Sequence, residues 1–357
     1  MAAAGPARIE DRLARRGGAV ELLRVPAAVF GVVAGLRGSL YDRGWLPSDR
    51  LDLPVISVGN LTVGGTGKTP MVAELVRRLQ ARGLRPGIVS RGYGAAAGEH
   101  NDEARALARD LPGVPHVQDA DRARGARGLA DRVDAIVLDD AFQHRRLARD
   151  LDLVLLDATR PWGLPATPPA FLPRGLLRES PRALGRAHAV CLTRTDQVAA
   201  DELERLCEQV LEMAPGVPLL RAVHRPRCLR DPRRPAEEFS LDELRGRTVE
   251  LVSGIGNPDA FEASVRDLGA RVAEHRRFPD HHPFGPDDLR GLGAQECWIV
   301  TTGKDAVKLD ADARALRVLE VELAFTAGAA VLDALLDALP PGRALRERRA
   351  LHEGLHG

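Results

Sequence analysis

Residues 61–70, LTVGGTGKTP, form a glycine-rich stretch that sharply narrows the choice of folds. The run before it, LPVISVG, is short, apolar and rich in β-branched residues, which predicts a buried strand. The run after it, MVAELVRRLQARG, has apolar residues at helical intervals and closes on Gly83, which predicts a helix. A glycine-rich turn between a strand and a helix is the setting of a phosphate-binding loop.

Lys68 in this turn is one of three lysines in a chain with 48 arginines. Gly64, Gly65 and Gly67 allow successive backbone N–H groups to point into one concavity. A compact ammonium can reach the β- and γ-phosphates of a nucleotide there, and the hydroxyl of Thr69 can ligate Mg²⁺. A rigid, forked guanidinium suits this position poorly. The alternative is an ordinary strand–helix turn with an incidental lysine.

The length of 357 residues exceeds the comfortable size of one hydrophobic core, so we expect two domains. The formal net charge is +1, aromatic residues make up 4% of the chain, and no basic block stands out, which argues against nucleic-acid binding. The four cysteines are scattered without zinc-ligand or redox spacing. We expect them to be buried thiols in a reducing compartment.

Residues 19–40 are mostly apolar but are interrupted by a glutamate, two arginines and a proline. A transmembrane helix needs about 20 uninterrupted apolar residues, so this stretch is a poor candidate for a simple span. Residues 1–50 carry eight arginines against five acidic residues, a local charge of +3. An apolar helix with basic flanks suits a membrane interface, and it suits equally a place on the protein's own core. The pattern leaves both interpretations open.

A second strand followed by a Gly-rich turn is predicted within residues 85–94. Further apolar strands are predicted at residues 133–140, 151–158 and 187–196, and residues 100–111 have a helical pattern. Strands that alternate with helices predict a parallel sheet with helices on both faces. Ligands of such sheets bind beyond the carboxyl ends of the strands. The chemically suggestive residues of this chain fall at these ends.

Residues 224–239, HRPRCLRDPRRPAEEF, are rich in Pro and Arg and lack apolar periodicity, which indicates a domain junction. A second α/β pattern follows. Its SGIGNPDAF run contains half of a dinucleotide fingerprint, which we interpret as a tight strand–helix turn. The predicted division is an N-terminal helix region over 1–45, a phosphate-loop domain over 46–225 and a smaller α/β domain over 226–357.

The run AIVLDDAFQHRRL places Asp139 and Asp140 at the end of an apolar strand. A phosphate loop needs a carboxylate opposite it to hold Mg²⁺ directly or through water. Adjacent side chains on an extended chain point to opposite sides. We therefore expect one carboxylate to face the metal and the other to act on a neighbour or on the substrate. The alternative is a plain turn at a strand end.

Six runs together resemble one family: GNLTVGGTGKTP, DDAFQHRRLARDLDLVLLDA, LPRGLLRES, GIGNPDAF, FPDHHPF and TTGKDAVKL. They occur in the order found in tetraacyldisaccharide 4'-kinase, the lipid A 4'-kinase of Gram-negative envelope synthesis. The resemblance extends over about residues 20–335.

The resemblance implies transfer of the ATP γ-phosphate to the 4'-hydroxyl of a tetraacylated glucosamine disaccharide 1-phosphate, giving lipid IVA. It implies a P-loop NTPase-like parallel sheet domain and a second α/β domain with a cleft between them. It also implies attachment to the cytoplasmic face of the inner membrane through the N-terminal helix, and so favours the membrane interface for residues 19–40.

By motif, the resemblance assigns ATP binding to a continuous stretch of the loop: Thr62, Val63, Gly64, Gly65, Thr66, Gly67, Lys68 and Thr69. It implies that Lys68 contacts the phosphates and that Thr69 ligates Mg²⁺. Asp139 and Asp140 are implied as the metal-binding and active-site acidic pair. Glu179 of LPRGLLRES matches the family pattern and joins Thr69 and Asp139 as a predicted metal ligand.

The family's catalytic aspartate lies in a Gly-Asp-Glu run, which NDE matches here, so the resemblance assigns this role to Asp102, although Asn101 replaces the glycine. Its implied partner is His281, the first histidine of FPDHHPF. A carboxylate can accept the proton of an attacking sugar hydroxyl, and a histidine can orient or tune that carboxylate. Metal binding by His281 and His282 lacks a third ligand at suitable spacing.

Other cations are candidates for the substrate's 1-phosphate or for the transferred group: Lys304, Lys308 and the arginines of HRRL. The loop departs from the general phosphate-loop pattern G-x-x-x-x-G-K-[ST] at Thr62, where that pattern has glycine. The chain departs from the family pattern at Arg174 and Ser180 in LPRGLLRES, at Ala141 and at Gly303.

The main rival function is a phosphate-loop GTPase or ATPase of the metallochaperone or regulatory type. Its support is LTRTD, because residues 193–196 stand where a guanine-reading N-K-x-D motif would lie. Thr193 in place of Asn and Arg194 in place of Lys argue against it. A second rival, a non-catalytic membrane adaptor with a degenerate loop, fits poorly with intact Lys68 and Asp139.

Overall fold

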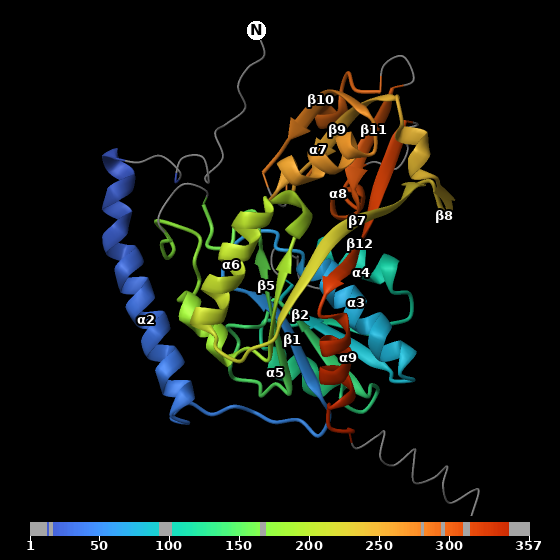
Figure 1. The fold of residues 1–357 in the computed structure, drawn as a ribbon. Helices are drawn as coiled ribbons and strands as arrows, with labels where there is room; N and C mark the ends of the chain where they lie inside the picture. Colours follow the sequence, from blue (N-terminus) through green and yellow to red (C-terminus); the bar gives the residue numbers. More distant parts are fainter. Residues whose placement is uncertain are drawn as a thin grey trace, which may run out of the picture. The chain divides into compact units, whose positions relative to one another are not determined.

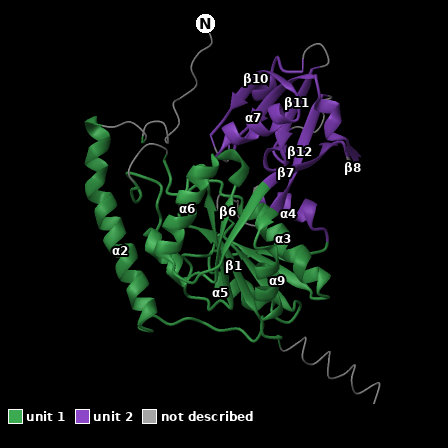
Figure 2. Ribbon diagram, in the orientation of Figure 1, with its two compact units in different colours: residues 1–93, 113–223, 325–357 green, residues 94–112, 224–324 purple. Residues whose placement is uncertain are grey.

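The computed structural model describes residues 13, 17–92, 102–164, 169–279, 282–293, 297–309 and 315–342 (Figure 1). The chain forms two compact units, coloured separately in Figure 2. Unit 1 comprises residues 1–93, 113–223 and 325–357, and unit 2 comprises residues 94–112 and 224–324.

Unit 1 is built on a parallel sheet with the strand order β7-β6-β5-β1-β4-β2-β3. The strands are β1 (Val55–Asn60), β2 (Pro86–Ser90), β3 (His116–Gln118), β4 (Ala135–Asp139), β5 (Leu151–Asp157), β6 (Ala189–Thr193) and β7 (Leu219–Asp231). Every residue of β1, β2, β4, β5 and β6 is buried, so both faces of this part of the sheet are covered.

The described helices of unit 1 are α2 (Arg24–Asp42), α3 (Lys68–Ala81), α5 (Arg122–Leu129), α6 (Ala200–Met213) and α9 (Ala329–Asp337), with 3₁₀ helices η1 (Gly18–Leu23), η2 (Pro181–Arg186) and η3 (Thr195–Gln197). Of these, α3 and α5 pack against strands of the sheet. α3 buries one face, with Met71, Val72, Leu75, Val76 and Leu79 inside. These are the positions that the helical spacing of the sequence predicts.

Unit 2 has a smaller parallel sheet with the strand order β10-β9-β11-β12. Its strands are β9 (Thr248–Ser253), β10 (Arg271–Arg277), β11 (Trp298–Thr302) and β12 (Leu316–Ala327), and β8 (Arg234–Phe239) pairs antiparallel with the end of β7. Its helices are α4 (Asp102–Asp110), α7 (Pro258–Asp267) and α8 (Gly303–Ala306), with 3₁₀ helices η4 (Leu241–Leu244) and η5 (Pro286–Leu289). The predicted second α/β region is therefore present.

The two-unit α/β architecture and the parallel sheets confirm the predicted fold class. The division of the chain differs from the predicted one at two places. The chain enters unit 2 at residue 224, next to the predicted boundary at 225, but residues 94–112 also belong to unit 2 and residues 325–357 belong to unit 1.

Ion pairs explain why the C-terminal part belongs to unit 1. Asp333 on α9 accepts hydrogen bonds from Arg78 at 2.7 Å and from Arg82 at 2.8 Å, both on α3. Arg82 also pairs with Asp337, and the Arg78 guanidinium lies over the Phe325 ring. Such contacts across more than 200 residues leave no signal in local sequence patterns.

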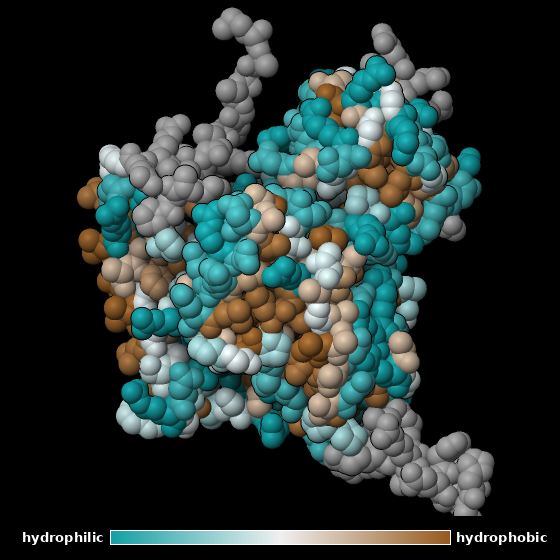
Figure 3. All heavy atoms as spheres, viewed as in Figure 1, coloured by the Kyte–Doolittle hydropathy of each residue, from teal (hydrophilic) through white to brown (hydrophobic). Residues whose placement is uncertain are grey.

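The N-terminal helix α2 presents an apolar face that the protein does not cover, as the brown side chains along this helix in Figure 3 show. Six apolar side chains, one just before the helix and five on it, are between 58% and 76% exposed: Leu22, Val25, Val29, Val32, Val33 and Leu36. Among the described residues, Gly18–Asp42 is the helix long and apolar enough to cross a membrane, and only 6% of its most apolar window is buried. A helix packed on the protein's core would bury this face.

Candidate functional site

The loop between β1 and α3 has the backbone geometry that its glycines allow. Gly64 has a φ of 124° and Gly67 a φ of 90°, a region that other residues rarely adopt. The Gly67 carbonyl accepts the first helical hydrogen bond, from the Met71 N–H, so α3 begins at the loop itself. The free N–H groups and partial positive charge of this helix end favour an anion.

The Lys68 ammonium lies among oxygen atoms at the carboxyl ends of two strands. Its Nζ is 3.4 Å from Asn60 Oδ1, at the end of β1, and 3.8 Å from Asp140 Oδ1, just beyond β4. Asn60 is fully buried and donates from Nδ2 to the Thr62 carbonyl at 2.7 Å. Asn60 therefore holds both the lysine and the start of the loop.

The acidic pair divides between two environments. Asp139 ends β4, pairs in register with Val58 of β1 and is only 2% exposed. Asp140 turns the chain out of the strand with a left-handed φ of 50°. Both oxygens of Asp140 accept from Arg178 Nη1, at 2.7 and 2.9 Å.

Asp140 is held in its charged form. Burial alone would raise the pKa of this carboxyl, but the charges of Lys68 and Arg178 outweigh burial and hold the pKa below its ordinary value. The backbone carbonyl of Asp140 accepts from Arg122 Nη2 at 3.2 Å, and burial lowers the pKa of the Arg122 guanidinium. One carboxylate thus stands among several cations, and this excess of positive charge suits a phosphate ligand.

Arg178 was missed by the sequence interpretation because its place depends on a distant pairing. The Arg178 N–H donates to the Leu61 carbonyl, and the Val63 N–H donates to the Leu176 carbonyl, both at 2.8 Å. Thr62 and Leu177 form the antiparallel bridge between these bonds. The LPRGLLRES run therefore lines one side of the phosphate loop.

The other side of the loop is fixed by the end of β6. The buried Thr193 hydroxyl donates to the Thr66 carbonyl at 3.0 Å. The Thr66 hydroxyl oxygen is buried, and within the described ranges it has no hydrogen-bond partner. In the LTRTD run that supports the GTPase alternative, Arg194 forms an ion pair with Asp157. That pairing occupies the side chain that stands at the lysine position of the motif.

These residues fit a nucleoside triphosphate with Mg²⁺. The described part of the chain has no group of three or more His, Cys, Asp or Glu side chains placed to hold a metal alone. A magnesium ion here would take phosphate oxygens together with one or two protein oxygens, as Mg²⁺ commonly does. Thr69, the second residue of α3, and the buried Asp139 are the protein groups of the right chemistry.

The predicted base, Asp102, is the first residue of α4. Its side chain and its predicted partner, His281, lie outside the described residues. Next to Asp102, Glu103 pairs with Lys304 Nζ at 3.9 Å. His282 hydrogen-bonds to Asp288 at 3.0 Å.

Lys308 has a buried acidic partner. Its Nζ is 3.0 Å from Asp305, which is fully buried and accepts hydrogen bonds from the Gly254 N–H and the Thr302 hydroxyl, both at 2.9 Å. Asn257 caps α7 by accepting from the Ala260 N–H. SGIGNPDAF is thus a tight strand–helix turn, as the sequence predicts.

The chain matches the family described as Tetraacyldisaccharide-1-P 4'-kinase over residues 19–340. It belongs to this family. A tetraacyldisaccharide 4'-kinase of Anaeromyxobacter sp. (strain K) is 44% identical over 344 residues, covering 88% of this chain and 89% of that protein. A tetraacyldisaccharide 4'-kinase of Syntrophus aciditrophicus (strain SB) is 38% identical over 318 residues, covering 81% of this chain and 84% of that protein.

A solved structure of LpxK from Aquifex aeolicus in complex with ATP is 30% identical, with a TM-score of 0.69, and covers 89% of this chain and 98% of that one. The chain is therefore a lipid A biosynthesis kinase of α/β fold. Membership decides between the predicted kinase and the GTPase or metallochaperone alternative, and it confirms the resemblance drawn from the six motifs.

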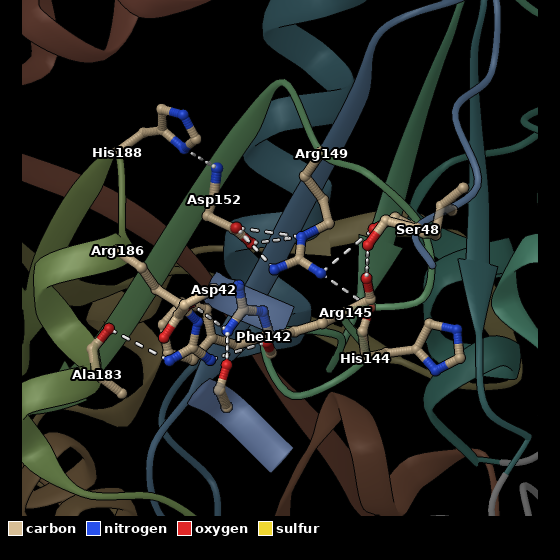
Figure 4. A network of polar contacts seen from close by, with 12 residues as sticks. Asp42, Ser48, Phe142, His144, Arg145, Arg149, Asp152, Ala183, Arg186 and His188 are labelled. Atoms are coloured by element: carbon tan, nitrogen blue, oxygen red, sulfur yellow. Dashed lines mark hydrogen bonds and ion pairs between the residues drawn. The ribbon is translucent and has the colours of Figure 1, made fainter. Parts of the chain in front are cut away.

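In the kinase, Glu179 forms an ion pair with Arg186 at 2.7 Å. The Arg186 guanidinium lies 3.6 Å from the centre of the Phe142 ring and donates to the Phe142 carbonyl (Figure 4). Burial lowers the pKa of this guanidinium, and Glu179 opposes that effect. The role of Glu179 as a metal ligand stays a prediction, and it would require this pair to loosen or to share its carboxylate.

The arginines of HRRL have structural partners. Arg145 Nη1 donates to the Gly38 carbonyl of α2 at 3.0 Å and lies 2.7 Å from Asp42, so it joins the end of α2 to the segment after the acidic pair (Figure 4). Arg146 contacts Asp121 at 3.3 Å. In the structure these arginines contact other parts of the protein, and among the described residues their hydrogen bonds and ion pairs do not reach the phosphate loop.

The environment of His144 is expected to make the folding stability of the protein depend on pH. Burial first, and then the charge of Arg122, lowers its pKa from 6.5 to about 4. The folded protein binds this proton less readily than the unfolded chain does. The contribution of His144 to the free energy of unfolding is therefore fully present above pH 6.5 and is lost as the pH falls towards 4. We expect a loss of about 1–3 kcal/mol from this residue, allowing for partial exposure.

Urea unfolding of the wild type and of His144→Gln at pH 7.5, 6.0, 5.0 and 4.5 tests this expectation. The variant should lose less stability over that range than the wild type. Equal slopes for the two proteins would show that His144 does not contribute.

Proposed function

We propose that Lys68 and its neighbours hold ATP while its γ-phosphoryl group passes to the 4'-hydroxyl of a tetraacylated glucosamine disaccharide 1-phosphate, forming lipid IVA. The observation that carries the proposal is the Lys68–Asp140–Arg178 cluster at the start of α3, in a chain of the tetraacyldisaccharide 4'-kinase family. Three cations (Lys68, Arg178 and Arg122) around two carboxylates (Asp139 and Asp140) leave a net positive charge where a phosphate would lie.

In this proposal the backbone of residues 62–69 binds the phosphates of ATP, and Lys68 contacts the β- and γ-phosphates. Thr69 and Asp139 hold Mg²⁺ with the phosphate oxygens, and Glu179 is a further candidate ligand. Bound Mg²⁺ supplies neutralisation of the charge that develops on the phosphates. Asp140 orients Lys68 and Arg178 towards the transferred group.

On the acceptor side, Asp102 takes the proton from the attacking 4'-hydroxyl, with His281 as its partner. The position of Asp102 at the start of a helix supports this role only in part, since acidic residues also favour helix starts for electrostatic reasons. The Glu103–Lys304 pair joins the residue after Asp102 to α8.

We also propose that α2 binds the cytoplasmic face of the inner membrane. Its exposed apolar side chains would enter the lipid, while Arg24, Arg37 and Arg43 would meet anionic head groups. Trp45, 72% exposed just beyond the helix, is of the type enriched at membrane–water interfaces. A lipid substrate gives such docking a purpose.

Charges on the apolar face of α2 are expected to release the protein from membranes. The triple variant Val25→Asp, Val29→Asp, Val32→Asp should reduce partition onto vesicles containing anionic lipid by roughly tenfold or more, because each buried valine contributes about 1.5 kcal/mol or more. A flotation assay measures this. The matched control is Leu211→Asp on α6, which is 46% exposed and should float like the wild type.

The activity is tested by incubating the protein with labelled ATP, Mg²⁺ and a tetraacyl disaccharide 1-phosphate. A doubly phosphorylated lipid supports the proposal, and label that stays in ATP or appears only as free phosphate contradicts it. Substituting GTP for ATP in the same assay shows which nucleotide the loop uses.

A further inference from the structure

We propose that Arg174 is a positioning residue for the kinase reaction, because it ties the start of the membrane helix to the segment that builds the phosphate site. The inference rests on the proposed function of that site. It assigns a catalytic consequence to a side chain that is remote from the reacting atoms.

Arg174 is almost fully buried, with only 7% of its side chain exposed. Its Nη2 donates to Glu21 Oε1 at 2.8 Å, and its Nη1 donates to the Leu13 carbonyl at 2.9 Å. Glu21 lies in η1, directly before α2, and also pairs with Arg24 in the first turn of α2. The hydrogen bond from Arg174 is the main cause of a lowered pKa of the Glu21 carboxyl. Arg174 thus holds the start of the helix by a charged hydrogen bond.

A tight turn transmits this contact to the phosphate loop. The Gly175 N–H donates to the Phe171 carbonyl. A Cβ on Gly175 would lie 2.3 Å from the Ala170 carbonyl oxygen, so the turn is too tight to hold a side chain at this position. Only one residue further on, the Leu176 carbonyl accepts from the Val63 N–H of the loop. Four residues after Arg174 stands Arg178, which holds Asp140.

α2 also packs directly on this turn. A Cβ on Gly31 would lie 2.6 Å from the Phe171 ring, so the helix backbone and the ring are in close contact. Leu13, Leu164 and Leu176 form a small buried cluster against which residues of η1 pack. Because the helix and the turn share these contacts, a displacement of α2 would move the residues that carry Arg178.

The consequence concerns turnover more than binding. ATP affinity comes mainly from the loop backbone and Lys68, neither of which touches Arg174. The placement of Arg178 on Asp140, by contrast, follows from the turn that Arg174 anchors. Loss of Arg174 is expected to misplace the charges around the transferred phosphoryl group. ATP binding should change less, because Asn60 and Thr193 still hold the loop at Thr62 and Thr66. Small misplacements of this kind cost large factors in rate.

The test uses the full-length protein with lipid substrate in mixed vesicles. Arg174→Ala should lower kcat by about tenfold, a typical size for the loss of a coupled contact, with KM for ATP changed less than about twofold. Glu21→Gln should show a smaller loss of the same kind, and Arg174→Lys should retain more activity than Arg174→Ala. The matched control is Arg205→Ala, an exposed arginine paired with Asp201 on α6, which should leave kcat unchanged.

A double variant, Glu21→Gln with Arg174→Ala, decides whether the two side chains act as one. A kcat no lower than that of Arg174→Ala supports the inference, and fully additive losses overturn it. An unchanged kcat per folded molecule, with only a lower melting temperature, overturns it as well. If Arg174→Ala does not fold, Glu21→Gln alone decides by the same kcat and KM criteria. Failure of the wild type to phosphorylate the lipid would refute the proposed function instead.

Discussion

Lys68→Ala is expected to lower phosphoryl transfer by roughly 10³-fold or more, because positioning and charge neutralisation supply nearly all of this kind of catalysis. The ammonium lies between Asn60 and Asp140 at the first turn of α3. Removing it also leaves Asp140 with the arginines Arg178 and Arg122 as its close cations. Single-turnover measurement with labelled ATP would check the loss, and near-normal turnover would remove the loop from the mechanism.

Lys68→Arg is the informative companion variant. The Lys68 side chain is only 12% exposed and reaches two oxygens from buried strand ends, so a larger, planar guanidinium would have to displace Asn60 or Asp140. We expect this variant to fail as well, although the charge is kept. Full activity of the arginine variant would show that the site needs a positive charge of any shape, and that the rarity of lysine in this chain has another cause.

The parts of the fold that the sequence predicts well are those with local causes. β1, the loop and α3 follow from a β-branched run, three glycines and helical spacing within 30 residues. Asp139 and Asp140 follow from one strand end. Each of these signals is complete within its own segment, so no knowledge of distant contacts is needed to interpret it.

The parts that sequence reasoning missed depend on long-range pairing. Arg178 enters the site through the bridge between Thr62 and Leu177, more than 100 residues apart in the chain. Residues 325–357 join unit 1 through ion pairs between α9 and α3. The apolar pattern of residues 19–40 is the same whether the helix is buried or exposed, so only the packing separates the two interpretations, and it leaves the face of α2 exposed.

The second large effect is expected at Asp102. If its carboxylate accepts the proton of the attacking hydroxyl, Asp102→Ala should lower kcat by about 10²–10⁴-fold while ATP still binds. His281→Ala should give a deficit of the same kind. If the two residues act as one, the double variant should be little worse than either single variant, because such units are strongly non-additive.

Asp102 is also the first residue of α4, where an acidic side chain can stabilise a helix without any part in catalysis. Asp102→Asn separates the two roles by rate, because asparagine keeps a polar side chain at the helix start but cannot accept the proton as a carboxylate does. If Asp102 is the base, the Asn variant should be stable and have a low kcat. If Asp102 only stabilises the helix start, the Asn variant should have a normal kcat, and the Ala variant should be about 0.5–2 kcal/mol less stable. Melting curves and kcat on the folded fraction of both variants measure the difference, and a stable Asn variant with wild-type kcat would exclude Asp102 as the base.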